Sequence, residues 1–387
     1  MAFRILLTVP NLVSNASPWR EAIGLAKYLP RDRFRLTICA LRRDGVEESR
    51  PLLNEMGVQC FVSRFRSRGW GVRRFVGALK DSRSLREFGP FDLQHSMDFT
   101  SSPFEALMSR RQAGVYLFSQ RNMNRNGSRL MLKAKASLAG AVFCVSDAVL
   151  QFMRELSPSA RLIRIHPGID TDLIPWRESA SSVRRPFRIL MVGHVARLKR
   201  FEDGIRAVAC LRADLPGLEL RIAGAVVDPA YLQDLKQLVR REQLDGLVSF
   251  LGPRRDVLDL MGQSDVLLHT ADTEAFGMVL IEAMAVSLPV IAPAIEGPKE
   301  IVEDQVSGLL VPPGEVGRYA EAIRALMKNP ELGHQLSFNA RKRVETLFNA
   351  ERMAQETAEV YTSLLTMNHG PRTTDYGTAD YGLREDR

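Results

Sequence analysis

The sequence has 387 residues, 45% of them hydrophobic and 25% charged, which is ordinary for a globular protein and long enough for two domains. It has no run of 18 or more apolar residues and no signal-peptide cleavage pattern, so we expect neither a membrane-spanning helix nor secretion. The net charge of +8 is uneven: residues 1–176 hold 27 Lys and Arg against 15 Asp and Glu, and the remainder holds 26 against 30, which predicts an anionic partner for the first half.

Apolar strand patterns alternate with helical patterns through the first half of the chain. The predicted strands there are 4–9, 34–41, 58–63, 91–96, 114–119, 141–146 and 161–166, and a helix is predicted over 18–29. Strands that alternate with helices predict a parallel sheet that is covered on both faces.

A strongly basic segment, residues 64–87, lies between the third and fourth of these strands. It holds eight Lys and Arg beside an apolar stripe at helical spacing, which is typical either of a helix on an anionic membrane or of a core-facing helix with solvated charges. The residues expected on a membrane or acceptor face are Arg66, Arg68, Trp70, Arg73 and Arg74, and the series Arg121, Arg125, Arg129 and Lys133 extends it. No recognised nucleic-acid-binding module accompanies these charges, so we expect no nucleic-acid partner.

A polar, proline-bounded stretch at 175–186 separates the two halves, and we interpret it as an interdomain linker. Strands are then predicted at 187–193, 218–224, 248–252, 265–270, 289–293 and 308–312, and helices near 201–213, 229–242, 277–286, 315–328 and 331–366. The sequence therefore predicts an α/β protein with two doubly wound parallel-sheet domains, 1–175 and 187–350, joined by a linker at 176–186. Two such sheets that face each other form a cleft at the carboxyl ends of their strands. Residues 367–387 lack aliphatic periodicity and are expected to be a disordered tail.

Two glutamates, Glu274 and Glu282, stand at and just after a predicted strand-to-helix turn in TADTEAFGMVLIEAMAVSLPVIAP (270–293). The backbone N–H groups at the helix start lack internal partners and favour a phosphate. The residues at this start are Phe276, Gly277, Met278 and Val279. Carboxylates accept hydrogen bonds from sugar hydroxyls, so the pattern predicts a nucleotide-sugar site. The alternative is a helix-capping acid followed by an ion-paired helix residue.

This stretch, EAFGMVLIEAMAVSLPVIA, resembles the E-x7-E signature of glycosyltransferase family 4, whose usual form is close to EGFGLVLLEAMACGLPVIA. The family consists of retaining enzymes of the GT-B fold, with two Rossmann-like domains that face a cleft. The resemblance implies that Glu274 contacts the donor sugar and Glu282 the ribose hydroxyls, so that a ligand rather than the core would bury Glu282. It also implies that a helix at 351–366 crosses back onto the first domain.

The segment ILMVGHVARLKRFEDGIRA (189–207) resembles the VGRLxxxKG segment of the family. A predicted strand ends at Gly193, and Lys199 falls on the family lysine, where a cation would neutralise charge on the leaving diphosphate. His194 replaces the family arginine, and Arg197 is a candidate substitute for it.

Two further segments carry candidate site residues. FDLQHSMDFTS (91–101) resembles DVVHxHD, which implies that His95 faces the transferred sugar, while Met97 replaces the second histidine. VSFLGPRRD (248–256) resembles VxFLGxV, which implies that Leu251 borders the base. The glycine pair that often follows the first strand in the family is absent, but Ser14, Asn15 and Ala16 are small enough to let the backbone approach a diphosphate.

The resemblance implies retaining transfer from a nucleotide-sugar, with UDP favoured, through front-face attack in which the diphosphate helps to take the acceptor proton. The resemblance also implies transfer without a metal ion or other cofactor. The four cysteines are too widely spaced to suggest a metal site, and the Asp-x-Asp triplet at 170–172 lies on the hinge side. The expected partners are the donor, a glycan, lipid-linked or small-molecule acceptor, and an anionic membrane surface, with the protein in the cytoplasm or peripheral on the inner face of the membrane. The alternatives are an inactive GT-B subunit that binds a partner or glycan, favoured by His194, Met97 and the glycine-free loop, and a sugar-nucleotide epimerase of similar architecture.

Overall fold

The computed structural model describes residues 2–14, 16–63, 88–110, 113–123, 128–174, 186–212 and 217–368. The basic segment 64–87 lies outside these residues, and so do Asn15, Arg125, residues 175–185 of the predicted linker and the predicted tail from residue 369. The prediction of a membrane or acceptor face at Arg66, Arg68, Trp70, Arg73 and Arg74 therefore falls outside the described part of the chain.

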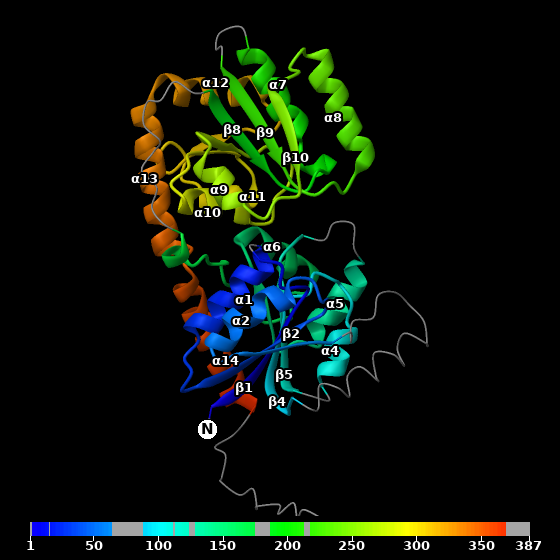
Figure 1. Cartoon of the computed structure of the whole chain (residues 1–387). Helices are drawn as coiled ribbons and strands as arrows, with labels where there is room; N and C mark the ends of the chain where they lie inside the picture. The colour runs from blue at the N-terminus through cyan, green and yellow to red at the C-terminus, as the bar shows by residue number, and fades with distance from the viewer. Residues whose placement is uncertain are drawn as a thin grey trace, which may run out of the picture.

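The described residues include thirteen strands in two separate parallel sheets, one above the other in Figure 1. The strands of the first sheet are β1 (Phe3–Val9), β2 (Phe34–Ala40), β3 (Gln59–Val62), β4 (Phe91–Ser96), β5 (Ala113–Gln120), β6 (Ala141–Cys144) and β7 (Leu162–Arg164). Those of the second are β8 (Phe187–Val192), β9 (Leu218–Ala223), β10 (Val248–Gly252), β11 (Val266–Leu268), β12 (Val290–Pro293) and β13 (Leu309–Val311). The sheet orders are β3-β2-β1-β4-β5-β6-β7 and β10-β9-β8-β11-β12-β13, so each sheet is doubly wound about its first strand. The predicted α/β class with two parallel-sheet domains is confirmed.

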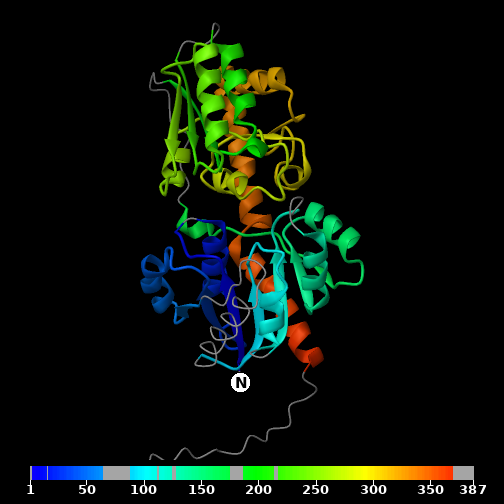
Figure 2. The ribbon, with the colours of Figure 1, turned by 90° about the vertical axis from the view of Figure 1, so that its right-hand side faces the viewer.

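Helices cover both sheets (Figures 1 and 2). The described helices of the first domain are α1 (Ser17–Tyr28), α2 (Val46–Glu55), α4 (Phe104–Ser109), α5 (Arg129–Ser137) and α6 (Asp147–Leu156). Those that follow are α7 (Phe201–Leu211), α8 (Pro229–Arg241), α9 (Val257–Gly262), α10 (Met278–Ala285), α11 (Glu296–Ile301), α12 (Val316–Lys328), α13 (Pro330–Leu347) and α14 (Ala350–Asn368). No helix among the described residues is both long enough and apolar enough to cross a membrane.

The long helical pattern predicted over 331–366 forms two helices rather than one. The break falls at Asn349, whose side chain accepts a hydrogen bond of 2.7 Å from the backbone N–H of Arg352 and so caps α14. At the break, the backbone N–H of Ile169 donates to the carbonyl of Phe348 (2.8 Å), and the N–H of Ala350 donates to that of Ile169 (3.0 Å). Helix α13 packs on α10 of the second domain and α14 on α1 of the first, as Figures 1 and 2 show, so the predicted crossover is confirmed.

An apolar core continues from one domain into the other. Val149 and Met153 of α6 belong to the same buried cluster as Phe276, Leu280 and Phe348 of the second half. This contact holds the carboxyl ends of the two sheets toward each other, which is where doubly wound sheets place their ligands.

Candidate functional site

A cleft of ≈ 570 Å³ lies between the two domains. The first domain contributes Val13, Ser17, Phe99, Arg121, Val145 and Pro167 to its lining. The second contributes Val192, Gly193, His194, Lys199, Ala223, Gly224, Ala225, Pro253, Arg254, Val257, Glu274, Phe276, Gly277, Met278, Val279 and Glu282. Most of the candidate residues from the glutamate segment and the basic loop thus meet in one place, although they come from positions up to 89 residues apart (Gly193 to Glu282).

Gly193 and Gly224, which follow the paired strands β8 and β9, both line the cleft. A Cβ atom on Gly224 would lie 1.8 Å from the carbonyl oxygen of Gly193, so no larger residue fits at position 224. The two glycines therefore leave backbone, not side chains, at the floor of the cleft.

The start of α10 opens into the cleft. Gly277 precedes this helix with φ of +115°, a conformation that L side chains rarely adopt, and no side chain caps the helix there. Because the first N–H groups of a helix have no partner within it, this end offers donors and partial positive charge to an anion. Met278 and Val279 line the cleft beside these groups.

Glu274 and Lys199 form an ion pair on the cleft wall. Nζ of Lys199 bonds to Oε2 of Glu274, and Nε2 of His269 lies 3.4 Å from the same oxygen, at the outer limit of a hydrogen bond. Burial alone would raise the pKa of Glu274, but the contact with His269 and the charge of Lys199 together lower it to about 2. Glu274 is therefore ionised at neutral pH and can accept, but not donate, hydrogen bonds.

Glu282 forms its ion pair with the opposite domain. Nε of Arg20, in the first turn of α1, lies 2.9 Å from Oε1 of Glu282, and the two side chains are 7% and 10% exposed. Burial raises the pKa of Glu282, and the charge of Arg20 opposes that rise. The expectation that a ligand rather than the protein would bury Glu282 is wrong, because the residue is already only 8% exposed and is ion-paired, as the alternative expected, with a partner from the first domain.

Arg121 directly follows β5 on the first-domain side of the cleft. Its guanidinium bonds to both carboxylate oxygens of Glu21 and donates to Oγ of Ser17 (2.5 Å), and its Cζ lies 5.6 Å from the ring centre of Phe99. The sequence interpretation that Arg121 extends a basic outer face is wrong, because its side chain is only 5% exposed and faces the cleft.

His95 lies in the core of the first domain and is absent from the cleft lining. Its Nδ1 is 2.7 Å from the hydroxyl of Tyr361 in α14, and its Nε2 is 2.7 Å from Oγ of Ser119 in β5. Burial, with a smaller effect of the Arg121 charge, lowers the pKa of His95 to about 3. The expectation that His95 faces the transferred sugar does not match this position, because core partners take both ring nitrogens.

Other expected residues also lie apart from the cleft. Arg197 points to the outer surface, where its Nη2 bonds to Asp234 at 2.7 Å and its side chain is 64% exposed, so it does not occupy the place of the missing family arginine. Leu251 packs against the core behind the cleft, and Ser14 and Ala16 flank residues that line it. His194 does line the cleft and is exposed.

The Asp-x-Asp triplet at 170–172 makes structural contacts. Nζ of Lys27 lies 2.8 Å from Oδ2 of Asp170 and 3.3 Å from Oδ2 of Asp172, and the hydroxyl of Tyr28 also bonds to both carboxylates. Within the described ranges, no three His, Cys, Asp or Glu side chains gather as they would around a metal ion.

Sequence reasoning missed the contribution of α1. Ser17, Arg20 and Glu21 share one face at the start of this helix: Arg20 bonds to Glu282 of the second domain, and Ser17 and Glu21 bond to Arg121. The sequence did offer a signal for this contribution, since the charged pair Arg20 and Glu21 directly follows the glycine-free loop. Arg254 was missed as well; it follows β10, lines the cleft and pairs with Asp256 at its rim.

Two protein-family models match the chain, one to each domain. The model described as Glycosyltransferase Family 4 matches residues 20–173, and the model described as Glycosyl transferases group 1 matches residues 175–343. The N-acetyl-alpha-D-glucosaminyl L-malate synthase of Bacillus anthracis is 27% identical over 232 residues, 58% of this chain and 60% of that protein. A D-inositol 3-phosphate glycosyltransferase of Saccharomonospora viridis is 28% identical over 223 residues, 56% of this chain and 51% of that protein. The chain thus spans less than two thirds of the length of these relatives.

Solved structures agree on the fold. The Anabaena protein HepE, in complex with UDP and glucose, has a TM-score of 0.74 at 23% identity, and the match covers 93% of this chain and 100% of HepE. Sucrose-phosphate synthase of Thermosynechococcus elongatus has a TM-score of 0.75 at 21% identity, with 94% and 100% covered. Both matches cover more than nine tenths of this chain and therefore include residues of both domains.

Proposed function

Because the chain belongs to glycosyltransferase family 4 and has its GT-B fold, we propose that it transfers a sugar from a nucleotide-sugar to an acceptor hydroxyl, with retention of configuration and without a metal ion. One observation carries the proposal. Lys199, Glu274, the open start of α10 and Glu282 line one wall of a single cleft. Lys199 supplies a cation and the start of α10 an anion site for the diphosphate. Glu274 and Glu282 supply carboxylates that accept hydrogen bonds from the donor sugar and from the ribose.

Each group has a distinct role in this proposal. The diphosphate binds to the N–H groups at the start of α10 and to Lys199, Glu274 accepts hydrogen bonds from the donor sugar, and Glu282 accepts them from the ribose. Because its pKa is about 2, Glu274 cannot protonate the leaving group. Stabilisation of the departing diphosphate then falls to Lys199 and the helix start, and the acceptor proton passes to a diphosphate oxygen.

UDP is the nucleotide that we propose, supported by the UDP and glucose bound to HepE, whose fold this chain shares. The acceptor is an envelope glycan, a lipid-linked sugar or a small molecule, and it binds beside Phe99, Ser17 and Arg121 on the first-domain wall. We also propose that the enzyme lies in the cytoplasm or on the inner face of the membrane. There the excess of positive charge in residues 1–176 would attract an anionic membrane surface that carries such an acceptor.

Calorimetry and thermal unfolding with UDP, GDP and their sugar conjugates test the donor site. At about 100 times its dissociation constant, a ligand adds roughly 2.7 kcal/mol to stability. We expect UDP or a UDP-sugar to stabilise the wild type but not Glu282→Ala. Turnover of the donor should continue in EDTA, and NMR of the product should show the anomeric configuration of the donor. Absence of nucleotide binding at millimolar concentration would contradict the proposal and favour the inactive-subunit alternative.

A further inference from the structure

The carboxylate of Glu282 is held by a side chain that does not line the cleft. Glu282 lines it, whereas Arg20 lies behind the carboxylate and approaches from α1 of the first domain. Arg20 uses its Nε to bond Oε1 at 2.9 Å. For the second oxygen, Oε2, the described part of the chain provides no hydrogen-bond partner.

This geometry leaves room for a ligand without breaking the ion pair. A carboxylate has two oxygens and about four lone-pair positions, so one oxygen can be fixed by an arginine while the other accepts from ribose hydroxyls. If Arg20 blocked the donor, its side chain would cover the Glu282 carboxylate on the cleft side. Arg20 is not among the residues that line the cleft.

Arg20 also opposes the effect of burial on Glu282. A buried carboxylate without a partner tends to become neutral, and a neutral acid is a poorer acceptor for two hydroxyl groups. Because the side chains of Arg20 and Glu282 are 7% and 10% exposed, their pairing is little screened by solvent.

We propose that Arg20 is a positioning residue for the donor: from the opposite domain it fixes the Glu282 carboxylate, ionised and oriented, for the ribose hydroxyls of the nucleotide. This inference rests on the proposed function and adds to it a contribution of the first domain to the donor site. The ribose site is complete only when α1 and α10 are in contact, so donor recognition depends on the approach of the two domains.

The experiment compares UDP with 2′,3′-dideoxy-UDP, which lacks both ribose hydroxyls, by calorimetry on the full chain. The wild type should bind UDP at least about tenfold more tightly than the dideoxy nucleotide, as expected for hydrogen bonds to a charged group. Arg20→Gln should lose most of this preference while its affinity for the dideoxy nucleotide changes by less than about twofold. Arg20→Lys should restore part of the preference for UDP. The double variant, Arg20→Gln with Glu282→Gln, should bind UDP as tightly as Glu282→Gln alone.

Arg255→Ala is the matched control. It removes another ion pair between the domains, the 2.7 Å contact of Arg255 with Glu48, without touching Glu282. Thermal unfolding of each variant shows that it is folded. The inference is overturned if Arg20→Gln keeps the preference for UDP over the dideoxy nucleotide. It is also overturned if Arg20→Gln and Arg255→Ala lower the affinity for both nucleotides by equal amounts. If the wild type binds neither nucleotide, the proposed function fails, and the positioning role fails with it.

Discussion

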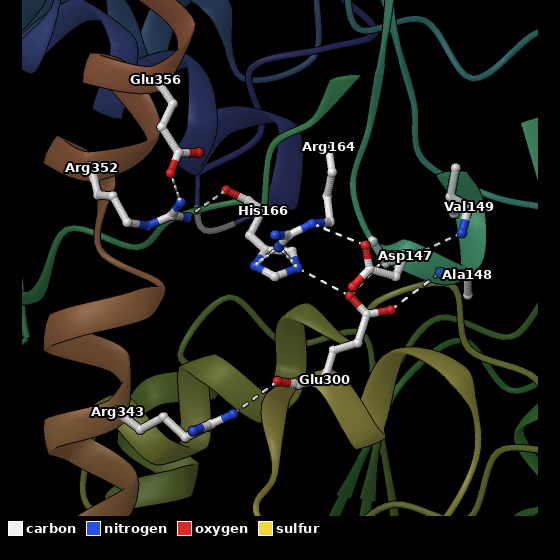
Figure 3. A network of polar contacts seen from close by, with 10 residues as sticks. Asp147, Ala148, Val149, Arg164, His166, Glu300, Arg343, Arg352 and Glu356 are labelled. Atoms are coloured by element: carbon white, nitrogen blue, oxygen red, sulfur yellow. Dashed lines mark hydrogen bonds and ion pairs between the residues drawn. The ribbon is translucent and has the colours of Figure 1, made fainter. Parts of the chain in front are cut away.

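The carboxylate of Glu300 in α11 lies 3.0 Å from Nε2 of His166, at the junction of the two domains (Figure 3). The same carboxylate accepts hydrogen bonds from the backbone N–H groups of Asp147 (2.9 Å) and Ala148 (3.2 Å) at the start of α6. Ser146 accepts from the next N–H group, that of Val149, at 3.1 Å. A side chain of the second domain thus completes the cap of a helix in the first.

Replacement of Glu300 by glutamine should destabilise the chain by about 1–3 kcal/mol at neutral pH, because two helix N–H groups lose a charged acceptor. Burial would raise the pKa of Glu300, but the bonds from His166 and from the two N–H groups lower it below its usual value. The stabilisation is therefore present above the unfolded-state pKa of about 4.3 and is lost as the pH falls through the lower folded-state pKa. Urea unfolding at pH 7 and pH 3.5 measures both effects. Glu303→Gln, at a side chain 57% exposed, should change stability by less than about 0.5 kcal/mol, and an equal loss in both variants would rule out the cap.

His95→Gln should change stability and its pH dependence rather than nucleotide affinity. The folded chain holds His95 neutral down to about pH 3, whereas the unfolded chain protonates it below about pH 6.5. Since protonation favours the unfolded state, this residue removes about 1.4 kcal/mol of stability for each pH unit below 6.5. Unfolding of the wild type at pH 7 and pH 5 should show this loss, and His95→Gln should reduce it. The exposed His334 provides a control, His334→Gln. A variant of unchanged stability with turnover reduced about 100-fold would instead assign His95 to catalysis.

Lys199→Ala should lower kcat for the nucleotide-sugar by about 100-fold or more, since it removes the only ammonium group in the described cleft lining. Lys199→Arg should retain part of the rate, because the charge remains while the geometry changes. Steady-state kinetics, with the exposed Lys236→Ala as control, make the comparison. A loss of less than about threefold would show that the start of α10 alone supports the diphosphate.

Gly277→Ala should destabilise the chain by about 1–2 kcal/mol and weaken nucleotide binding. A side chain at φ of +115° is strained, and its Cβ would lie 3.1 Å from Cδ1 of Leu280. Gly317→Ala is the matched control within α12, where an added Cβ has no neighbour within 4 Å, and it should be neutral or stabilising. Thermal unfolding and calorimetry with UDP measure the two effects. Equal behaviour of the two variants would mean that the turn before α10 is not specifically required.

The strands and the glutamate segment could be predicted because their signals are local. Apolar runs bounded by turns mark each strand, and the spacing of Glu274 and Glu282 places both at one strand-to-helix turn. The partners of the site could not be predicted in the same way. Arg20 meets Glu282 across 262 positions, and no local pattern encodes that distance.

His95 illustrates the same limit for a residue that was assigned to the site. Its position near the end of a strand, β4, is compatible with a cleft or with a core, and the choice depends on Tyr361, which is 266 positions away in α14. The break between α13 and α14 was implied by the family resemblance, which starts a crossover helix at residue 351, but not by the apolar periodicity. The helical pattern is continuous, but Asn349 caps a new helix where the chain crosses the segment at Ile169.

Helix α14 also determines the order in which the chain can fold as it is synthesised. It supplies Ala354, Ala358, Tyr361 and Leu365 to the core of the first domain, although β7, the last strand of that domain, ends at Arg164. The ribosome therefore completes the whole second domain, which takes on the order of 10–40 s at typical elongation rates, before the first sheet receives the helix that covers it. During that interval the contacts of α14 with α1, β4 and β5 cannot form, so the domain that is made first can complete its core only after the second has been synthesised.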